Sequence, residues 1–293
     1  MSDDLHVPVM LEDTVRVLGP KKGEKYLDLT AGYGGHAKEI IKVIGDESLA
    51  TLVDRDDFAV EHLKKKFPRA RIIKSDFAGA IKLLAKEGNK FDIVLADLGV
   101  SSVQLDQPDR GFGFKNDSEL DMRMDRSQYI TAKEIINNYS KKHLVEILES
   151  YGDEPRAKRI VDLILENRPL NKTSELETLV AKVYPGYSKK NPATRTFQAI
   201  RIEVNNEVWQ LKELLNNITG ILEQSARLAI ITFHSIEDGI VKKFFKENSG
   251  KYDGVVKDLK VLKSSDTIDI VRNLRSRSAI LRSVIYENKH IKK

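Results

Sequence analysis

The chain has 293 residues, 41% of them hydrophobic and 32% charged, a composition typical of an ordinary globular protein with one large or two medium domains. It contains no cysteine, which excludes disulfides, zinc–thiolate sites, iron–sulfur clusters and every thiol nucleophile. The formal net charge is +5, and residues 239–293 hold 14 Lys and Arg against 6 Asp and Glu. This uneven charge favours a polyanionic partner such as nucleic acid, although a surface of solvated lysines would give the same count.

The sequence gives no sign of a membrane or export signal. No stretch approaches the roughly 20 apolar residues that a membrane span needs. The first eight residues include two aspartates and lack the apolar segment of a signal peptide. We therefore expect a cytoplasmic protein without a membrane partner.

Apolar strand-like segments alternate with helix-like segments over the first hundred residues, a pattern typical of βαβ units and a parallel sheet. The pattern predicts helices over residues 12–18, 37–43, 58–67 and 81–86. It predicts strands over residues 25–29, 49–53, 70–74 and 91–96, each followed by or ending near an aspartate. Parallel sheets bind ligands beyond the carboxyl ends of their strands.

The alternation stops near residue 105, and helical signals dominate from there to about residue 224. Two S/T-x-x-E capping boxes, at Thr131 and Ser174, predict helix starts, and Pro169 predicts the end of a helix near residue 167. Strand signals return over residues 227–233, 255–262 and 278–286, and the last two can pair as a closing hairpin. We therefore expect a discontinuous α/β domain, residues 1–106 and 215–293, with an inserted helical domain, residues 107–214.

The first predicted strand leads into a turn with three glycines in four positions, Gly32, Gly34 and Gly35, and then into a helix. A strand, a glycine turn and a helix in this order are typical of a nucleotide-type ligand site. The glycine spacing alone is a weak signal, because glycines are common in any βα turn. A P-loop is excluded, since no Gly-Lys-Ser/Thr follows, and the six histidines show no metal-ligand spacing.

Four aspartates follow the successive strands: Asp28, Asp54, Asp76 and Asp97. An acid after the second strand suits a ribose diol. A ring of carboxylates is unfavourable for the pyrophosphate of NAD but attracts a cation such as the sulfonium of S-adenosylmethionine. Each aspartate could instead cap the following helix. An NAD-dependent oxidoreductase stays open at this point.

Motifs spread over nearly the whole chain resemble one family, the MraW family of bacterial 16S rRNA (cytosine-N4)-methyltransferases, type H. They are residues 6–10 (HVPVM), 27–36 (LDLTAGYGGH), 97–106 (DLGVSSVQLD), 110–112 (RGF), 120–125 (LDMRMD), 194–199 (TRTFQA), 233–238 (FHSIED) and 275–279 (RSRSA). So many ordered motifs make the resemblance highly specific.

The resemblance implies a Rossmann-like class I methyltransferase domain, with a mostly parallel sheet and a closing antiparallel strand, plus a helical insert that helps to bind RNA. It implies transfer of a methyl group from S-adenosylmethionine to the exocyclic N4 of a cytidine in the decoding region of 16S rRNA, within the small ribosomal subunit or its precursor. Carried over by position, the cofactor contacts are Gly34, Gly35, His36, Asp54, Phe77, Asp97 and Gln104. No metal is implied, and the oligomeric state stays open, a homodimer included.

The absence of cysteine agrees with methylation of an amine, which needs no covalent enzyme intermediate, and disagrees with thiolate-dependent methylation at cytosine C5. Asp97 could accept a hydrogen bond from the target amine or hold the cofactor, and His234 lies after the last parallel strand, beside the same predicted pocket. The alternatives are a strand-end turn for His234 and a helix cap for Glu237. Arg110, Arg123 and Arg195 are candidates for RNA phosphates, and Phe112 and Phe197 for stacking on the base, with ion pairs and core packing as alternatives. A non-catalytic ribosome assembly factor is the other function left open.

Overall fold

A computed structural model describes residues 8–100, 105, 107–113, 117–186, 191–249, 256–263 and 277–287, and it divides into two compact units. The sheet unit comprises Met1–Gly99 with Val208–Lys293, and the helical unit comprises Val100–Glu207. Both boundaries lie a few residues before those expected from the sequence. Among the described residues, no helix is long and apolar enough to cross a lipid bilayer.

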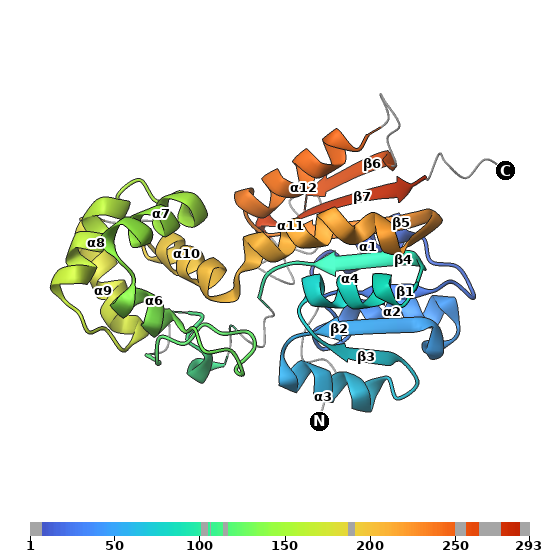
Figure 1. Ribbon diagram of the computed structural model, residues 1–293, viewed down its shortest axis with the longest axis horizontal. Helices are drawn as coiled ribbons and strands as arrows, with labels where there is room; N and C mark the ends of the chain where they lie inside the picture. Colours follow the sequence, from blue (N-terminus) through green and yellow to red (C-terminus); the bar gives the residue numbers. More distant parts are fainter. Residues whose placement is uncertain are drawn as a thin grey trace. The chain divides into compact units, whose positions relative to one another are not determined.

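The described part of the sheet unit contains a seven-stranded sheet in the order β3-β2-β1-β4-β5-β7-β6 (Figure 1). Neighbouring strands from β3 to β5 pair in parallel, and β7 runs antiparallel to both β5 and β6. The predicted parallel sheet with a closing antiparallel strand is therefore confirmed. The strands are β1 (Tyr26–Asp28), β2 (Ala50–Asp54), β3 (Arg71–Lys74), β4 (Phe91–Asp97), β5 (Leu222–Thr232), β6 (Val256–Lys263) and β7 (Ile280–Tyr286).

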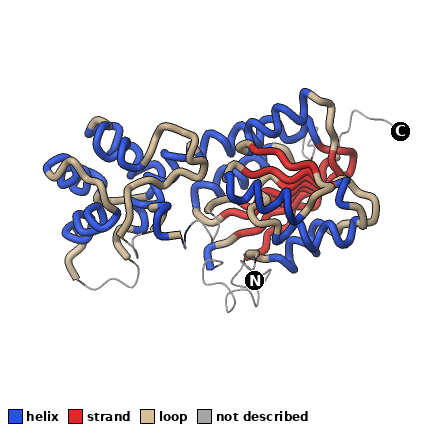
Figure 2. The backbone as a smooth tube through the Cα atoms, turned by 90° about the horizontal axis from the view of Figure 1, so that it is seen from below, coloured by secondary structure: helices blue, strands red, loops and turns tan. Residues whose placement is uncertain are grey.

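Helices cover both faces of this sheet (Figure 2) because its central strands are apolar on both sides. Successive side chains of a strand point to opposite faces. Thus Leu27 and Val94 pack with α4, α11 and α12, whereas Tyr26 and Ile93 pack with α1, α2 and α3. These helices are α1 (Leu11–Leu18), α2 (Gly35–Ile44), α3 (Asp57–Lys66), α4 (Phe77–Lys86), α11 (Glu207–Asn217) and α12 (Ser235–Glu247).

The helical unit has its own apolar core, built from the inward faces of its helices. Its longer helices are α6 (Ala132–Asn138), α7 (Lys141–Gly152), α8 (Ala157–Glu166), α9 (Thr173–Val183) and α10 (Thr194–Asn205). The predicted cap at Thr131 is confirmed, since its side chain accepts the N–H of Glu134 at 3.1 Å. The end of α8 at Glu166 likewise confirms the stop predicted from Pro169.

The capping box predicted at Ser174 is wrong. Helix α9 already begins at Thr173, and the carboxylate of Glu175 accepts the N–H of Lys172 at 2.8 Å. The Ser174 hydroxyl instead donates to Asp117 at 2.7 Å. The observed N-cap is Lys172 with Glu175 at N3, and the S/T-x-x-E pattern does not detect it because Lys172 is neither Ser nor Thr.

Candidate active site

The glycine turn after β1 requires glycine for reasons of backbone and packing. Gly34 has φ of 73°, and a Cβ there would lie 2.4 Å from Cε2 of Phe67. A Cβ on Gly35 would lie 2.3 Å from Cγ of Pro8. Contacts within the protein thus account for both glycines, and their predicted contact with a cofactor remains a prediction.

Asp28, at the end of β1, is a buried carboxyl group held by two donors. The Tyr26 hydroxyl donates to Oδ2 at 2.7 Å, and the N–H of Thr30 donates to Oδ1 at 3.1 Å. Burial raises the pKa of Asp28 to about 6, because the charged form loses its hydration. The neighbouring Asp54 adds to this rise by Coulomb repulsion.

Asp54, at the end of β2, connects its strand to the glycine turn. Its Oδ2 accepts the N–H of Gly32 at 2.8 Å, and its Oδ1 accepts the N–H of Asp56 at 2.9 Å. The backbone N–H of Arg55 donates to this carboxyl group as well, so about one of its roughly four acceptor sites remains for a ribose hydroxyl. Burial raises the pKa of this carboxyl group as well.

Asp97, at the end of β4, carries a buried oxygen with no hydrogen-bond partner among the described residues. This atom is Oδ1. The backbone N–H of Asp97 donates to the Thr30 hydroxyl at 2.6 Å, so Thr30 links the ends of β1 and β4 through contacts to Asp28 and Asp97. Burial, followed by repulsion from Asp28 and Glu237, raises the pKa of Asp97 well above its ordinary value. An unsatisfied buried acceptor is costly, which indicates that a donor or a cation belongs beside it.

His36 lies next to this carboxyl group. Its Nδ1 is 3.8 Å from Oδ2 of Asp97, and its Nε2 is 3.2 Å from the carbonyl oxygen of Val9. A carbonyl only accepts hydrogen bonds, so this contact requires a proton on Nε2, and Nδ1 faces Asp97. The sequence predicts His36 as a cofactor contact, and in the structure its ring lies next to Asp97.

The remaining predicted cofactor positions are less informative. Phe77 is the first residue of α4 and is partly buried against the sheet core. Asp76 caps this helix by accepting the N–H of Gly79 at 2.7 Å, so capping explains that acid. Gln104 lies outside the described residues.

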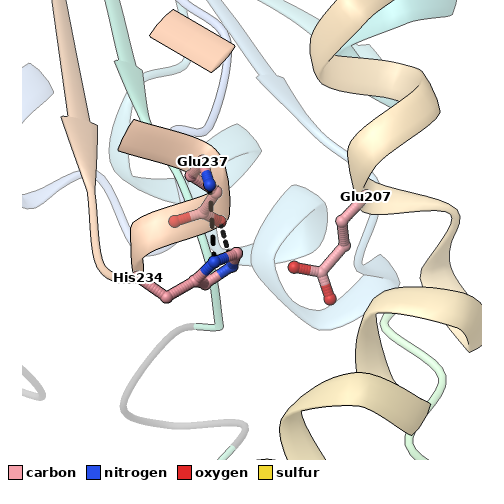
Figure 3. Close-up of side chains that lie close together, drawn as sticks. All are labelled: Glu207, His234 and Glu237. Carbon is pink, nitrogen blue, oxygen red and sulfur yellow. Dashed lines mark hydrogen bonds and ion pairs between the residues drawn. The ribbon is translucent and has the colours of Figure 1, made fainter. Parts of the chain in front are cut away.

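His234 is the N-cap of α12, and both of its ring nitrogens face Glu237 (Figure 3). Nδ1 accepts the backbone N–H of Glu237 at 3.4 Å, and Nε2 lies 3.1 Å from Oε1 of the same residue. Oε2 of Glu237 accepts the N–H of Phe233 at 2.9 Å. These contacts support the capping alternative for Glu237, and they make His234 the N-cap of the same helix, which the sequence did not predict. Glu207, also drawn in Figure 3, pairs with Arg201 at 2.9 Å within the helical unit.

Three predicted substrate residues are packed inside the helical unit, which supports the structural alternatives for them. Arg110 is 2% exposed, and its Nη2 donates to the carbonyl oxygens of Arg123 and Met124, each at 3.0 Å. Phe112 and Phe197 are 7% and 4% exposed and belong to the core. The core alternative holds for both rings, and the guanidinium satisfies buried carbonyls rather than phosphates.

The other two predicted substrate residues differ from each other. Arg123 forms two hydrogen bonds with Asp121, at 2.7 and 2.9 Å, and donates to two backbone carbonyls as well. Its donors are therefore already used. Arg195 is exposed, and no carboxylate lies within ion-pair distance of it among the described residues. Of the five, only Arg195 keeps an exposed guanidinium without an acidic partner in that part of the chain.

Sequence reasoning missed Thr30 and Tyr26, which hold the carboxyl groups of this site in place. Thr30 contacts both strand ends, and Tyr26 supplies the hydroxyl that faces Asp28. Tyr26 and Asp28 are two residues apart in one strand and therefore share a face, a signal that the sequence did contain. Nothing in the sequence marked Thr30.

The residues present fit a ligand that is positively charged or rich in donors. Asp28, Asp54 and Asp97 follow three neighbouring parallel strands, and the buried Oδ1 of Asp97 has no partner among the described residues. S-adenosylmethionine offers a sulfonium, an ammonium and a ribose diol to such a set. The sheet order, the reversed β7 and this acidic edge define a class I S-adenosylmethionine-dependent methyltransferase.

The chain belongs to the MraW methylase family, whose model matches residues 3–287. It is 40% identical to a ribosomal RNA small subunit methyltransferase H from Caldicellulosiruptor saccharolyticus, over 94% of this chain and 97% of the relative. The protein of the same name from Picosynechococcus is 42% identical over 94% and 95% of the two chains. That from Mycoplasmopsis synoviae is 44% identical over 83% and 82%. The family speaks against the NAD-dependent oxidoreductase that the glycine turn alone left open.

Proposed function

We propose that this protein methylates the exocyclic N4 of a cytidine in the decoding region of 16S rRNA, with S-adenosylmethionine as the methyl donor. The names of the relatives support an rRNA substrate in the small subunit. The family resemblance supports the cytidine N4 position. The observation that carries the chemistry is the carboxyl group of Asp97, buried at the carboxyl edge of the sheet in a chain without any thiol.

The residues would hold the cofactor through charge and hydrogen bonds. Asp54 would accept from a ribose hydroxyl while it keeps the N–H of Gly32, and Asp97 would accept from the ammonium group. Gly34, Gly35, His36, Phe77 and Gln104 complete the proposed contacts. When bound, S-adenosylmethionine supplies an electrophilic methyl group on a cationic sulfur.

The target amine is itself the nucleophile, so the protein has to orient it and does not need a covalent intermediate. Its lone pair is delocalised into the cytosine ring, and a hydrogen-bond acceptor at the amine favours the pyramidal, nucleophilic form. Oδ1 of Asp97 is the acceptor available at this edge for one of the two tasks, the cofactor's ammonium or the target amine. We do not include His234, because its ring nitrogens are turned towards Glu237.

The experiment that tests the proposal is nucleoside mass spectrometry of 16S rRNA from cells with and without the gene. We expect N4-methylated cytidine to disappear on deletion and to return with the wild-type gene. Complementation with Asp97→Asn should leave the modification absent, while calorimetry reports the cofactor affinity of the purified variant separately.

The same experiment separates the enzyme from a non-catalytic assembly factor. An assembly factor predicts that deletion disturbs subunit maturation without changing the nucleoside profile. It also predicts that Asp97→Asn complements the maturation defect as well as the wild type does. An unchanged nucleoside profile on deletion would reject the proposed reaction.

A further inference from the structure

Two groups of cations on the helical unit differ in their partners. Among the described residues, four further cations belong to neither group: Arg110 and Arg168 donate to backbone carbonyls, and Lys133 and Lys182 are exposed. The first group is neutralised by nearby carboxylates in six ion pairs: Arg123–Asp121, Arg126–Asp109, Lys141–Asp162, Lys142–Glu146, Lys172–Glu119 and Arg201–Glu207. The second group comprises Arg156, Lys158, Arg159 and Arg195. These four are exposed, and the described part of the chain offers them no carboxylate within ion-pair distance.

The second group gathers where three helices meet, and we call it the basic corner. The guanidinium of Arg156 lies 4.4 Å from the centre of the Tyr184 ring and donates to the carbonyl of Val183, which joins the start of α8 to the end of α9. Burial and Glu154 raise the pKa of Tyr184, and the positive charge of Arg195 opposes this rise. Arg195 therefore lies near the same ring. Lys158 follows in the first turn of α8.

The backbone also brings the starts of α8 and α10 together. The carbonyl oxygen of Arg195 is packed against Gly152, where a Cβ would lie 2.8 Å away. Gly152 ends α7, and only four residues separate it from the start of α8. Neither α8 nor α10 has a side-chain cap on its N-terminus, so the positive ends of two helix dipoles add to the charge of the side chains.

The acids near the basic corner do not cancel it. Glu154 is 2% exposed, and its Oε1 is occupied by the Tyr184 hydroxyl and the N–H of Arg156. Asp153 is exposed beside it. The four cations and two helix N-termini therefore outweigh the negative charge of these two acids.

We propose that the basic corner binds the phosphate backbone of the RNA substrate. This inference rests on the proposed function for its choice of partner. Arginine suits phosphate because its planar fork can donate two parallel hydrogen bonds. Stacking on Tyr184 holds the Arg156 guanidinium in place before binding, which lowers the entropy cost of ordering it.

The test compares two double variants of the full-length protein that remove the same charge from equivalent places. Lys158→Gln/Arg159→Gln neutralises the first turn of α8, and Lys141→Gln/Lys142→Gln neutralises the first turn of α7, where the lysines are already paired. Anisotropy would measure affinity for a 16S rRNA fragment with the decoding region and for an unrelated folded RNA of equal length, at several salt concentrations. Calorimetry with S-adenosylmethionine and circular dichroism would report that both variants are folded.

We expect the α8 variant to lose roughly tenfold in affinity for both RNAs and to reduce the slope of log K against log salt by about 2, since two phosphate contacts are lost. The α7 variant should match the wild type. Equal losses in the two variants, or no loss in the α8 variant, would overturn the assignment. Tighter binding of the wild type to poly-L-glutamate than to either RNA would assign the corner to an acidic protein instead.

The outcome is separable from that of the proposed reaction. If the α8 variant loses RNA affinity as expected while 16S rRNA from deleted cells keeps its N4-methylated cytidine, the reaction is wrong and the RNA surface stands. If the nucleoside disappears on deletion but the α8 variant binds both RNAs like the wild type, the surface is wrong and the reaction stands.

Discussion

The buried carboxyl group of Asp28 should make the protein less stable at neutral pH than an uncharged side chain of the same shape would. We predict that Asp28→Asn raises the free energy of unfolding above pH 7. The asparagine oxygen can still accept the N–H of Thr30, now 3.1 Å from Oδ1, and its amide can donate to the Tyr26 hydroxyl, now 2.7 Å from Oδ2. The side-chain volume is therefore preserved, and the change removes the charge together with the acceptor of the Tyr26 hydroxyl proton.

The magnitude follows from the pKa of Asp28. The pKa is about 6 in the folded state against 3.8 for an unperturbed aspartate, and each pKa unit corresponds to about 1.4 kcal/mol. Between pH 4 and 6 the folded state binds more protons than the unfolded state, so stability falls as the pH rises through this window. Above it the charged group costs about 3 kcal/mol, and exchanging a charge-assisted hydrogen bond for a neutral one leaves a net gain of about 1–3 kcal/mol.

Urea unfolding at pH 4.5 and pH 8 measures this difference. The variant should be more stable than the wild type at pH 8 and close to it at pH 4.5. Asp57→Asn is the control, because Asp57 is exposed and its ion pair with Lys74 at 2.6 Å contributes at most about 1 kcal/mol. A destabilised Asp28→Asn at pH 8, or a difference from the wild type that does not vary with pH, would refute the reasoning.

Three further predictions concern the glycine turn and the helical unit. Asp54→Ala should weaken S-adenosylmethionine binding by about 1–3 kcal/mol in calorimetry, because the proposed ribose contact is lost. Gly34→Ala should lower the melting temperature more than Gly88→Ala does, since both have positive φ but only Gly34 would place a Cβ against the Phe67 ring. Arg110→Met should lower the free energy of unfolding by about 2–4 kcal/mol, because two buried carbonyls lose their donor.

Each of these three has an outcome that contradicts it. Unchanged cofactor affinity in Asp54→Ala would remove Asp54 from the site. Equal melting temperatures for the two glycine variants would mean that the Phe67 ring moves freely away from the turn. A neutral Arg110→Met would show that the carbonyls find water instead.

The sheet was predictable because its signals are local and repeated. Strands β1, β2 and β4 are short apolar runs that end at an aspartate, and the helices between the strands have clear apolar faces, as in α4 (Phe77–Lys86). The start of α4 was predicted several residues late, at residue 81. The side chain of Asp76 begins the helix by capping Gly79, and Phe77 and Ala78 precede the apolar periodicity.

The helical unit shows where sequence reasoning fails for side chains. A motif such as RGF indicates that Arg110 and Phe112 matter, but the sequence does not distinguish a residue that builds a loop from one that contacts a ligand. Arg110 became a structural residue because its guanidinium lies where two backbone carbonyls need a donor, in a segment thirteen residues further along the chain. That pairing depends on the folded path of both loops, which no local pattern encodes.

The acidic edge of the sheet links stability to binding. Asp28 and Asp97 each have a raised pKa, and Oδ1 of Asp97 has no partner among the described residues, so this edge is unfavourable for the protein alone. Apolar or amide side chains would stabilise the same strand ends. A bound cationic ligand makes this edge favourable, because its positive charge compensates the negative charges of the carboxylates. On this argument Asp28→Asn should gain stability only in the absence of S-adenosylmethionine, and a saturating concentration of it should stabilise the wild type more than the variant.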